Sequence, residues 1–207
     1  MDSNLLNGKL VRLTSEDPEI LAKAFSRWGR DSEYIRLLDS EAAILWSVKK
    51  FKDWIEKDLG SAQPNDFFFS IRTLEGDLLI GFIGLFGIQW SHGDTWVGIG
   101  IGEREYWGKG YGTDAMHVIL RYAFLELNLH RVSLGVFGYN KRAIRSYEKA
   151  GFKLEGCLRG SLHRDGRRWD MFNMGILRKE WDQLQAQGLN PVFKGKRLPE
   201  GELVHGN

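Results

Sequence analysis

Apolar residues recur along this chain either at every second position or at every third to fourth position. The first spacing predicts strands and the second predicts helices, and together they account for most of the chain. The clearest helix begins at Thr113, because the apolar residues that follow lie on one broad face. Its apolar stripe consists of Met116, Leu120, Ala123, Phe124 and Leu127, extended by Ala115, Ile119 and Tyr122. Residues 140–150 form a second expected helix, and Gly151 follows it at the position where a left-handed residue commonly ends a helix.

The rest of the pattern predicts one mixed α+β domain. The expected strands are 9–14, 67–73, 78–90, 96–101, 131–137, 154–163 and 169–177. The other expected helices are 15–30, 48–59 and, shorter, 178–187. Residues 31–46 fit either a helix or a loop. Residues 188–207 hold two of the four prolines and no periodicity, so we expect an extended or frayed tail after a domain that spans 1–187.

Composition supports a folded domain. The chain has 207 residues, of which 43% are hydrophobic and 27% charged, too apolar for disorder. There is neither a membrane-spanning apolar stretch nor the basic-then-apolar pattern of a secretion signal, so we expect a cytoplasmic protein without a membrane partner. A formal net charge of +2 disfavours nucleic acid as the main partner. Cys157 is the only cysteine, which excludes an internal disulfide, and we expect it to pack within a sheet.

Glycine is over-represented and clustered: ten of the 25 glycines fall between Gly81 and Gly112. Residues 107–113, Trp-Gly-Lys-Gly-Tyr-Gly-Thr, lie between an expected strand and the clearest helix. Unpaired N–H groups at a helix N-terminus attract phosphate, and glycines let the backbone approach it closely. The spacing matches neither G-x-x-x-x-G-K-[ST] nor G-x-G-x-x-G. Alone, the segment fits equally a tight turn that only packs a helix on a sheet.

The helix at 140–150 favours the ligand interpretation. Asn140 can cap this helix, and Tyr147 lies two turns later on nearly the same face. Alone, this arrangement is most often an ordinary capped helix with a half-buried tyrosine. Together with the glycine turn, it is a specific combination.

The combination resembles the GNAT superfamily of acyl-CoA-dependent N-acetyltransferases, in its RimJ/RimL-like branch. The matching segments are GIGIGEREYWGKGYGTDA, NLHRV and NKRAIRSYEKAGF, and LLIGFIGLF is similar to an earlier strand of the branch. The resemblance is strongest over 96–174 and covers most of the chain. Trp107 stands where the superfamily usually has Gln or Arg, a departure that this branch shares.

The resemblance implies a central mixed sheet, mostly antiparallel, whose parallel strands 96–101 and 131–137 splay apart to hold acetyl-CoA as cosubstrate, with no metal. Glycines at 98 and 100 would make room for the pantetheine arm. A neutral amine would attack the thioester directly, and Tyr147 would be the general acid that protonates the departing thiolate. The implied cofactor-binding residues are Ile99, Ile101, Trp107, Gly108, Lys109, Gly110, Tyr111, Gly112, Thr113, Asn140 and Ala143. Lys141, Arg142 and Arg145 are further candidates for the outer phosphates.

The general base and the acceptor pocket stay open. Relatives often carry a Glu where this chain has Trp96; His92 and Asp94 precede it, and a water relay is the alternative. The segments expected to form the acceptor pocket are rich in aromatic residues, which suit either cation–π contact or the core. They are Trp28, Tyr34, Trp46, Trp54, Trp90, Trp96 and Trp169. The same segments hold acidic Glu33, Asp39 and Glu41 and basic Arg159, His163 and Arg164.

Three classes of function are compatible with these features. We expect an N-acetyltransferase that acts on a primary amine, either a protein N-terminus or a small molecule, and a homodimer is compatible with the aromatic content. The alternatives are a non-catalytic acyl-CoA-binding module and an interaction protein without a ligand. Tyr147 favours the enzyme, because only catalysis requires it.

Overall fold

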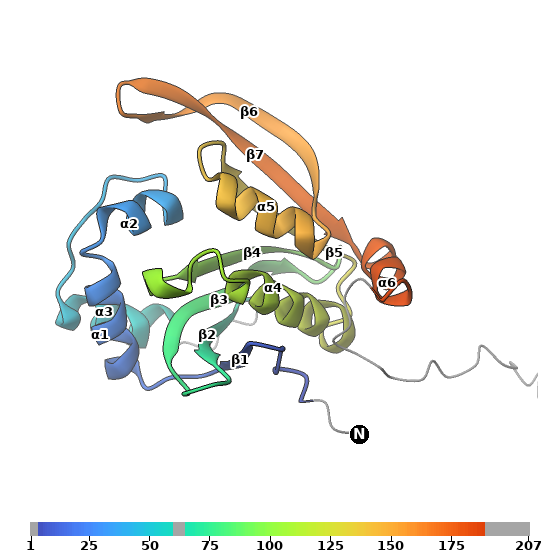
Figure 1. The fold of residues 1–207 in the computed structure, drawn as a ribbon, viewed down its shortest axis with the longest axis horizontal. Helices are drawn as coiled ribbons and strands as arrows, with labels where there is room; N and C mark the ends of the chain where they lie inside the picture. The colour runs from blue at the N-terminus through green and yellow to red at the C-terminus, as the bar shows by residue number, and fades with distance from the viewer. Residues whose placement is uncertain (1–3, 60–64, 189–207) are drawn as a thin grey trace, which may run out of the picture.

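The computed structural model describes residues 4–59 and 65–188, and a seven-stranded sheet runs through it in the order β1-β2-β3-β4-β5-β7-β6 (Figure 1). The strands are β1 (Val11–Thr14), β2 (Phe67–Thr73), β3 (Leu79–Gln89), β4 (Asp94–Ile101), β5 (Arg131–Phe137), β6 (Lys153–Arg164) and β7 (Arg167–Leu177). The helices are α1 (Pro18–Trp28), α2 (Ser32–Leu38), α3 (Val48–Trp54), α4 (Tyr111–Arg121), α5 (Lys141–Ala150) and α6 (Arg178–Ala186). Only β4 and β5 pair in parallel, so the expected mixed, mostly antiparallel GNAT-like sheet is confirmed.

Helices cover both faces of this sheet. Phe68 of β2 and Phe82 of β3 point to one face, where they pack against Phe25 of α1 in a cluster that α3 completes. Ile83 and Leu85 of β3 point to the other face and belong to the larger core under α4. The alternation of apolar side chains along β3 therefore places a core on each side of the sheet.

Several expected boundaries shift. The segment that fitted either a helix or a loop contains α2, which Asp31 caps by accepting hydrogen bonds from the N–H groups of Glu33 and Tyr34. α1 begins only at Pro18, after an Asp17 cap, and α4 continues as a π-helical turn over Tyr122–Glu126. The tail expected beyond residue 188 lies outside the described residues.

The expectation that Cys157 packs within a sheet is wrong. Cys157 is exposed on β6, the outermost strand, which is exposed along most of its length. The β6–β7 hairpin extends beyond the helices that cover the rest of the sheet (Figure 1). In the described part of the chain, every helix is too short or too polar to cross a membrane.

Asp114 fastens the N-terminal segment to α4. Its buried carboxylate accepts hydrogen bonds from the backbone N–H groups of Lys9, Leu10 and Val11, at 2.7–3.1 Å. About two helical turns later, at the end of α4, the Arg121 guanidinium, also buried, donates to the carbonyl of Leu5 at 3.0 Å. These contacts fix the start of β1 against the first turn of α4.

We expect Asp114→Asn to lower the free energy of unfolding by about 2–3 kcal/mol. The three backbone N–H groups lose a charged acceptor, and at least one of them would face the NH2 group of the asparagine, which cannot accept a hydrogen bond. In a chain of this length, that loss corresponds to a melting temperature roughly 5–10 °C lower, measurable by circular dichroism. The matched control is Asp53→Asn on the exposed surface of α3. Equal melting temperatures for the two variants would contradict this role of Asp114.

His117 makes stability depend on pH. Its Nδ1 is buried and has no hydrogen-bond partner among the described residues. Burial lowers the pKa of His117 from 6.5 to about 4, and the nearby Asp114 carboxylate only partly opposes this. The unfolded state therefore binds a proton more readily, so the stability that the neutral imidazole contributes is present above pH 6.5 and is lost as the pH falls towards 4.

The free energy of unfolding, measured with urea, should fall by roughly 2 kcal/mol between pH 7.5 and pH 5 because of His117 alone. His117→Gln should show a distinctly smaller fall, since the amide does not titrate. Equal falls in the wild type and the variant would show that other groups govern stability in this range.

Candidate active site

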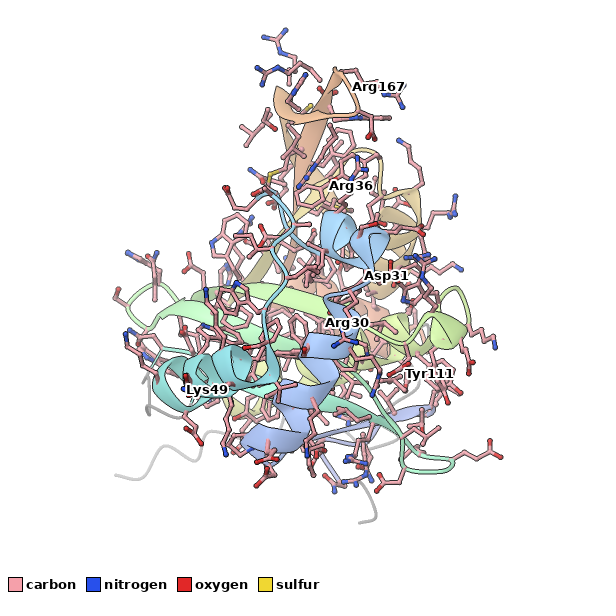
Figure 2. All side chains as sticks on the ribbon, turned by 90° about the vertical axis from the view of Figure 1, so that its left-hand side faces the viewer. Arg30, Asp31, Arg36, Lys49, Tyr111 and Arg167 are labelled. Carbon is pink, nitrogen blue, oxygen red and sulfur yellow. The ribbon has the colours of Figure 1, made fainter. Side chains whose placement is uncertain are left out.

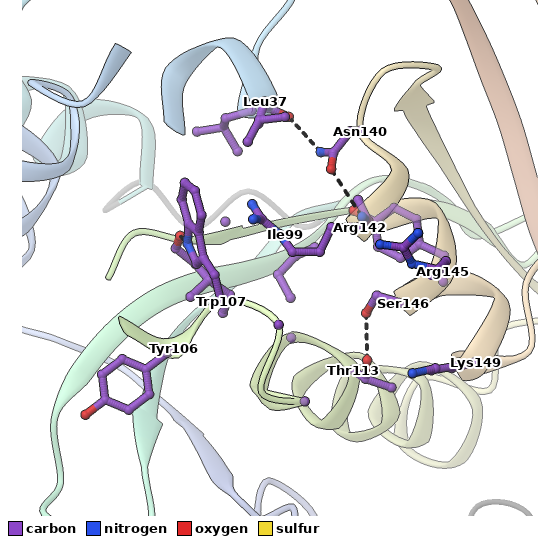
Figure 3. A pocket seen from close by; sticks show the side chains of 18 of the residues that line it. Leu37, Ile99, Tyr106, Trp107, Thr113, Asn140, Arg142, Arg145, Ser146 and Lys149 are labelled. Atoms are coloured by element: carbon purple, nitrogen blue, oxygen red, sulfur yellow. Dashed lines mark hydrogen bonds between the residues drawn. The ribbon is translucent and has the colours of Figure 1, made fainter. Parts of the chain in front are cut away.

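Strands β4 and β5 pair at their start and then separate. Parallel pairing joins residues 94–96 of β4 to 131–133 of β5, after which β4 continues beside β3 and β5 continues beside β7. A cleft of about 270 Å³ opens at this divergence. Residues of α2, β4, the turn before α4, and α5 line it (Figure 3).

The glycine turn presents backbone N–H groups to this cleft. α4 begins at Tyr111, and Gly110 is its N-cap with φ 93°, while Gly108 has φ 73°. Both values lie in the left-handed region that favours glycine. No side chain caps this helix start, and Gly108, Gly110 and Gly112 all line the cleft. The unpaired N–H groups and the helix dipole make this end of the cleft suitable for phosphate.

α5 forms the opposite wall. Asn140 is its N-cap, as expected: the Oδ1 atom accepts a hydrogen bond from the Ala143 N–H at 3.1 Å, while Nδ2 donates to the carbonyl of Leu37 at 3.4 Å (Figure 3). Further along α5, the Ser146 and Thr113 hydroxyls lie 2.7 Å apart and join α5 to α4. The start of α5 is thereby tied to both α2 and α4.

Tyr147 lines the cleft two turns after the Asn140 cap. Its hydroxyl makes no hydrogen bond within the described residues, and burial raises the pKa of Tyr147 to about 12. The phenol therefore stays protonated at neutral pH and can donate a proton or a hydrogen bond.

The charge of the lining is positive. Arg142, Arg145 and Lys149 line the cleft, and none of them forms an ion pair with the described residues. The lining contains no carboxylate or imidazole in the part of the chain that the structure describes. The guanidinium of Arg142 lies 4.0 Å from the ring centre of Trp107, and burial lowers the pKa of Arg142. Such a lining suits an anionic ligand.

The residues that the resemblance implied converge on this one cleft, apart from Lys109, Tyr111 and the exposed Lys141. Lys109 is exposed, and Tyr111 instead packs edge-on against Tyr106, with ring centres 4.9 Å apart. The cleft also contains residues that the sequence did not assign to the cofactor. They are Tyr34, Leu37 and Leu38 of α2, with Tyr106, Ser146 and Lys149. The signal for α2 was present in the capping residue Asp31.

Packing explains the glycines of β4. A Cβ atom on Gly98 would lie 3.2 Å from the ring of Phe86, and one on Gly100 would lie 2.7 Å from both the Phe82 ring and the Tyr34 hydroxyl. Phe82 and Tyr34 belong to the cluster on the face of the sheet that carries α1 and α3. A side chain at Gly100 would clash with its neighbours and one at Gly98 would be tight, so room for a cofactor arm is not needed to explain these glycines.

None of the three positions considered for a general base lines the cleft. Asp94 lies at the start of β4, opposite Arg131 of β5 in the strand register. His92 is exposed in the preceding turn, and Trp96 is half exposed. Residues 4–59 and 65–188 contain no group of three His, Cys, Asp or Glu residues that could hold a metal ion. The chemistry within the described cleft thus depends on hydroxyl, backbone and cationic groups.

Comparison with known proteins gives a consistent result. Residues 9–153 match the acetyltransferase (GNAT) domain family. The chain is 33% identical over 175 residues to the uncharacterized N-acetyltransferase p20 of Bacillus licheniformis, covering 83% of this chain and 93% of that protein. It is 35% identical over 103 residues to a spermidine N(1)-acetyltransferase of Vibrio cholerae, covering 50% of this chain and 59% of the relative.

A crystal structure of spermidine N-acetyltransferase from Vibrio cholerae in complex with CoA and spermine has the same fold. It aligns with a TM-score of 0.72 and 24% sequence identity over 83% of this chain and 97% of that one. The family match covers more than half of the chain, and p20 is over 30% identical along most of its length. This chain belongs to the GNAT acetyltransferase family and is an N-acetyltransferase, which transfers an acetyl group to an amine.

Proposed function

We propose that acetyl-CoA binds in the cleft between β4 and β5 and that its acetyl group passes directly to a primary amine in a ternary complex. One observation carries this proposal: the glycine turn at the start of α4 and the protonated Tyr147 of α5 line the same cleft, at the divergence of two parallel strands. A phosphate-binding turn can hold CoA and a proton donor can protonate the departing thiolate, so the two groups together suit acetyl transfer from a CoA thioester.

Each part of the cofactor has a complementary group. The pyrophosphate accepts hydrogen bonds from the amides of residues 108–113, close to the positive charges of Arg142 and Arg145. The pantetheine arm extends along β4 at Ile99 and Ile101, where the β5 partner is missing, and Asn140 faces it from α5. The alternative of a turn that only packs a helix does not explain why these groups share one cleft.

The reaction needs one proton donor and no acyl-enzyme. The amine nitrogen attacks the thioester carbonyl carbon, the C–S bond breaks, and the thiolate takes the Tyr147 proton. The pKa of Tyr147 is about 12 and that of a thiol is ~8.5, so complete transfer to the thiolate is uphill by roughly 5 kcal/mol and is offset when Tyr147 takes up a proton again. The proton released by the nitrogen goes to solvent, which restores Tyr147.

We place the chain in the RimJ/RimL-like branch and infer that its acceptor is a small primary amine. We also infer that the protein acts in the cytoplasm. The segment WGKGYGT, which begins with Trp107, supports the branch, and the relatives named spermidine N(1)-acetyltransferases support the acceptor class. A peptide N-terminus is the other acceptor to be tested.

The test is release of free CoA thiol from acetyl-CoA with spermidine, an amino-acid amide and a short peptide as separate acceptors, with mass spectrometry of the products. We expect amine-dependent thiol release and an N-acetylated product for the small amines. Binding of acetyl-CoA without turnover on any amine would instead support an acyl-CoA-binding module. If acetyl-CoA does not raise the melting temperature, the cleft is not its site.

A further inference from the structure

Tyr34 is a second buried phenol in the cleft, and it comes from the opposite wall. It lies on α2, is 5% exposed, and lines the cleft together with Gly100 of β4. The hydroxyl is so close to β4 that a Cβ atom on Gly100 would lie 2.7 Å from it. The Tyr34 hydroxyl therefore reaches the backbone of β4 between Ile99 and Ile101.

The Tyr34 hydroxyl lacks a hydrogen-bond acceptor among the described residues. The ring packs edge-on against Trp28, with centres 6.3 Å apart, and the hydroxyl lies near the Phe82 ring. This apolar burial raises the pKa of Tyr34, so the phenol keeps its proton. The Tyr34 oxygen is not among the buried polar atoms that lack a partner, because it opens onto the cleft, where it can donate a hydrogen bond to a ligand oxygen.

The position of Tyr34 is fixed from two sides. Asp31 accepts a hydrogen bond from the Tyr34 backbone N–H at 3.2 Å and forms an ion pair with Arg104, which precedes the glycine turn. At the other end of α2, the Tyr139 hydroxyl donates to the carbonyl of Arg36 at 2.6 Å. Figure 2 labels Asp31 at the start of α2 and Arg36 near its other end. The hydroxyl is thus held in place before any ligand arrives.

We propose that Tyr34 is a catalytic residue whose hydroxyl donates a hydrogen bond to the carbonyl oxygen of the acetyl thioester. This inference rests on the proposed function, which places the pantetheine arm along Ile99 and Ile101. The amine uses its lone pair to attack, so it is not the acceptor for this donor. The carbonyl oxygen is a free acceptor, and it gains negative charge as the C–N bond forms.

Tyr34 and Tyr147 then have different tasks. Tyr34 keeps its proton throughout: the carbonyl oxygen gains negative charge in the tetrahedral intermediate and loses it when the C–S bond breaks. Tyr147 gives its proton to the sulfur. The two phenols approach the thioester from α2 and α5, on opposite sides of the cleft.

The test is Tyr34→Phe, which removes the hydroxyl and keeps the ring. We expect kcat to fall by about 10²-fold, the typical loss for one oxyanion donor, with little change in the KM of the amine. Tyr122→Phe is the matched control, because it removes a phenol hydroxyl outside the cleft, and we expect it to stay within about threefold of the wild type. A loss of equal size in both variants would assign Tyr34 a structural role and overturn the proposal.

A binding comparison tests Tyr34 without turnover. S-ethyl-CoA has a thioether in place of the thioester and therefore lacks the carbonyl oxygen. Wild-type protein should bind acetyl-CoA more tightly than S-ethyl-CoA by calorimetry, and Tyr34→Phe should remove the difference. The infrared carbonyl band of bound acetyl-CoA should also move to higher frequency in the variant. If the wild type shows no preference, Tyr34 does not contact the carbonyl, even where amine-dependent turnover confirms the proposed function. If the wild type prefers acetyl-CoA but acetylates no amine, the contact between Tyr34 and the carbonyl oxygen is supported and the proposed function is contradicted.

Discussion

Tyr147→Phe is expected to lower kcat by about 10²–10⁴-fold while the affinity for acetyl-CoA stays close to that of the wild type. The variant loses the proton donor for the thiolate but keeps the aromatic ring, which packs against Phe152 and the core. Steady-state thiol release gives kcat, and calorimetry with acetyl-CoA gives the affinity. Because the general acid acts after binding, only the first quantity should change.

The pH dependence provides a second readout for Tyr147. With a pKa of about 12, the phenol stays protonated below about pH 11, so its ionisation should not reduce the wild-type rate in this range. The rate should instead rise with pH as the acceptor amine loses its proton, and then level off. A fall in kcat between pH 8 and 10 would contradict a Tyr147 acid with a raised pKa.

Tyr122→Phe is the control for this experiment, since Tyr122 packs against Phe67 and Phe69 at the far end of α4 from the glycine turn. We expect nearly normal turnover from that variant. Nearly normal turnover from Tyr147→Phe as well would exclude Tyr147 as the acid.

Gly110→Asp is expected to weaken acetyl-CoA binding by about 10²–10³-fold while the protein stays folded. Aspartate is a favoured N-cap residue, tolerates a left-handed backbone better than most residues, and interacts favourably with a helix N-terminus. Its carboxylate would, however, lie where the pyrophosphate accepts hydrogen bonds from the turn. Two negative charges about 4 Å apart repel by ~4 kcal/mol near a protein surface, which accounts for the expected loss.

Two variants separate charge from shape. Gly110→Asn has nearly the same size as the aspartate variant without the charge, so we expect a much smaller loss of affinity. Gly166→Asp introduces aspartate at another glycine with positive φ, at the tip of the β6–β7 hairpin away from the cleft, and should bind normally. Calorimetry gives the affinities and circular dichroism the melting temperatures. Equal affinities for the aspartate and asparagine variants would rule out an anion at this turn.

The long periodic elements were predictable because their patterns are local. α4 has an apolar stripe of several turns, and α5 has both a cap at Asn140 and a stop at Gly151, which adopts φ 100°. Both walls of the cleft were therefore predictable from the sequence. The parallel strand pair followed from the family resemblance and not from periodicity.

The features that the sequence left open depend on contacts between distant segments. α2 has only seven residues, too few for a helical pattern, and it is held by Arg104, Tyr139 and Asn140 from other elements. The contact between Asp114 and the N–H groups of residues 9–11 spans more than 100 positions. The exposure of Cys157 follows from the place of β6 at the sheet edge, which strand periodicity does not reveal.

The central claim is that acetyl-CoA lies between β4 and β5 with its pyrophosphate on the turn before α4. Nitrogen-15 labelling of the glycines makes this claim directly measurable, because Gly108, Gly110 and Gly112 line the cleft while Gly87 and Gly166 lie elsewhere. We predict that titration with acetyl-CoA shifts the amide resonances of the first three glycines and leaves the other two unchanged. Acetyl-CoA binding that leaves Gly108, Gly110 and Gly112 unshifted would contradict the account.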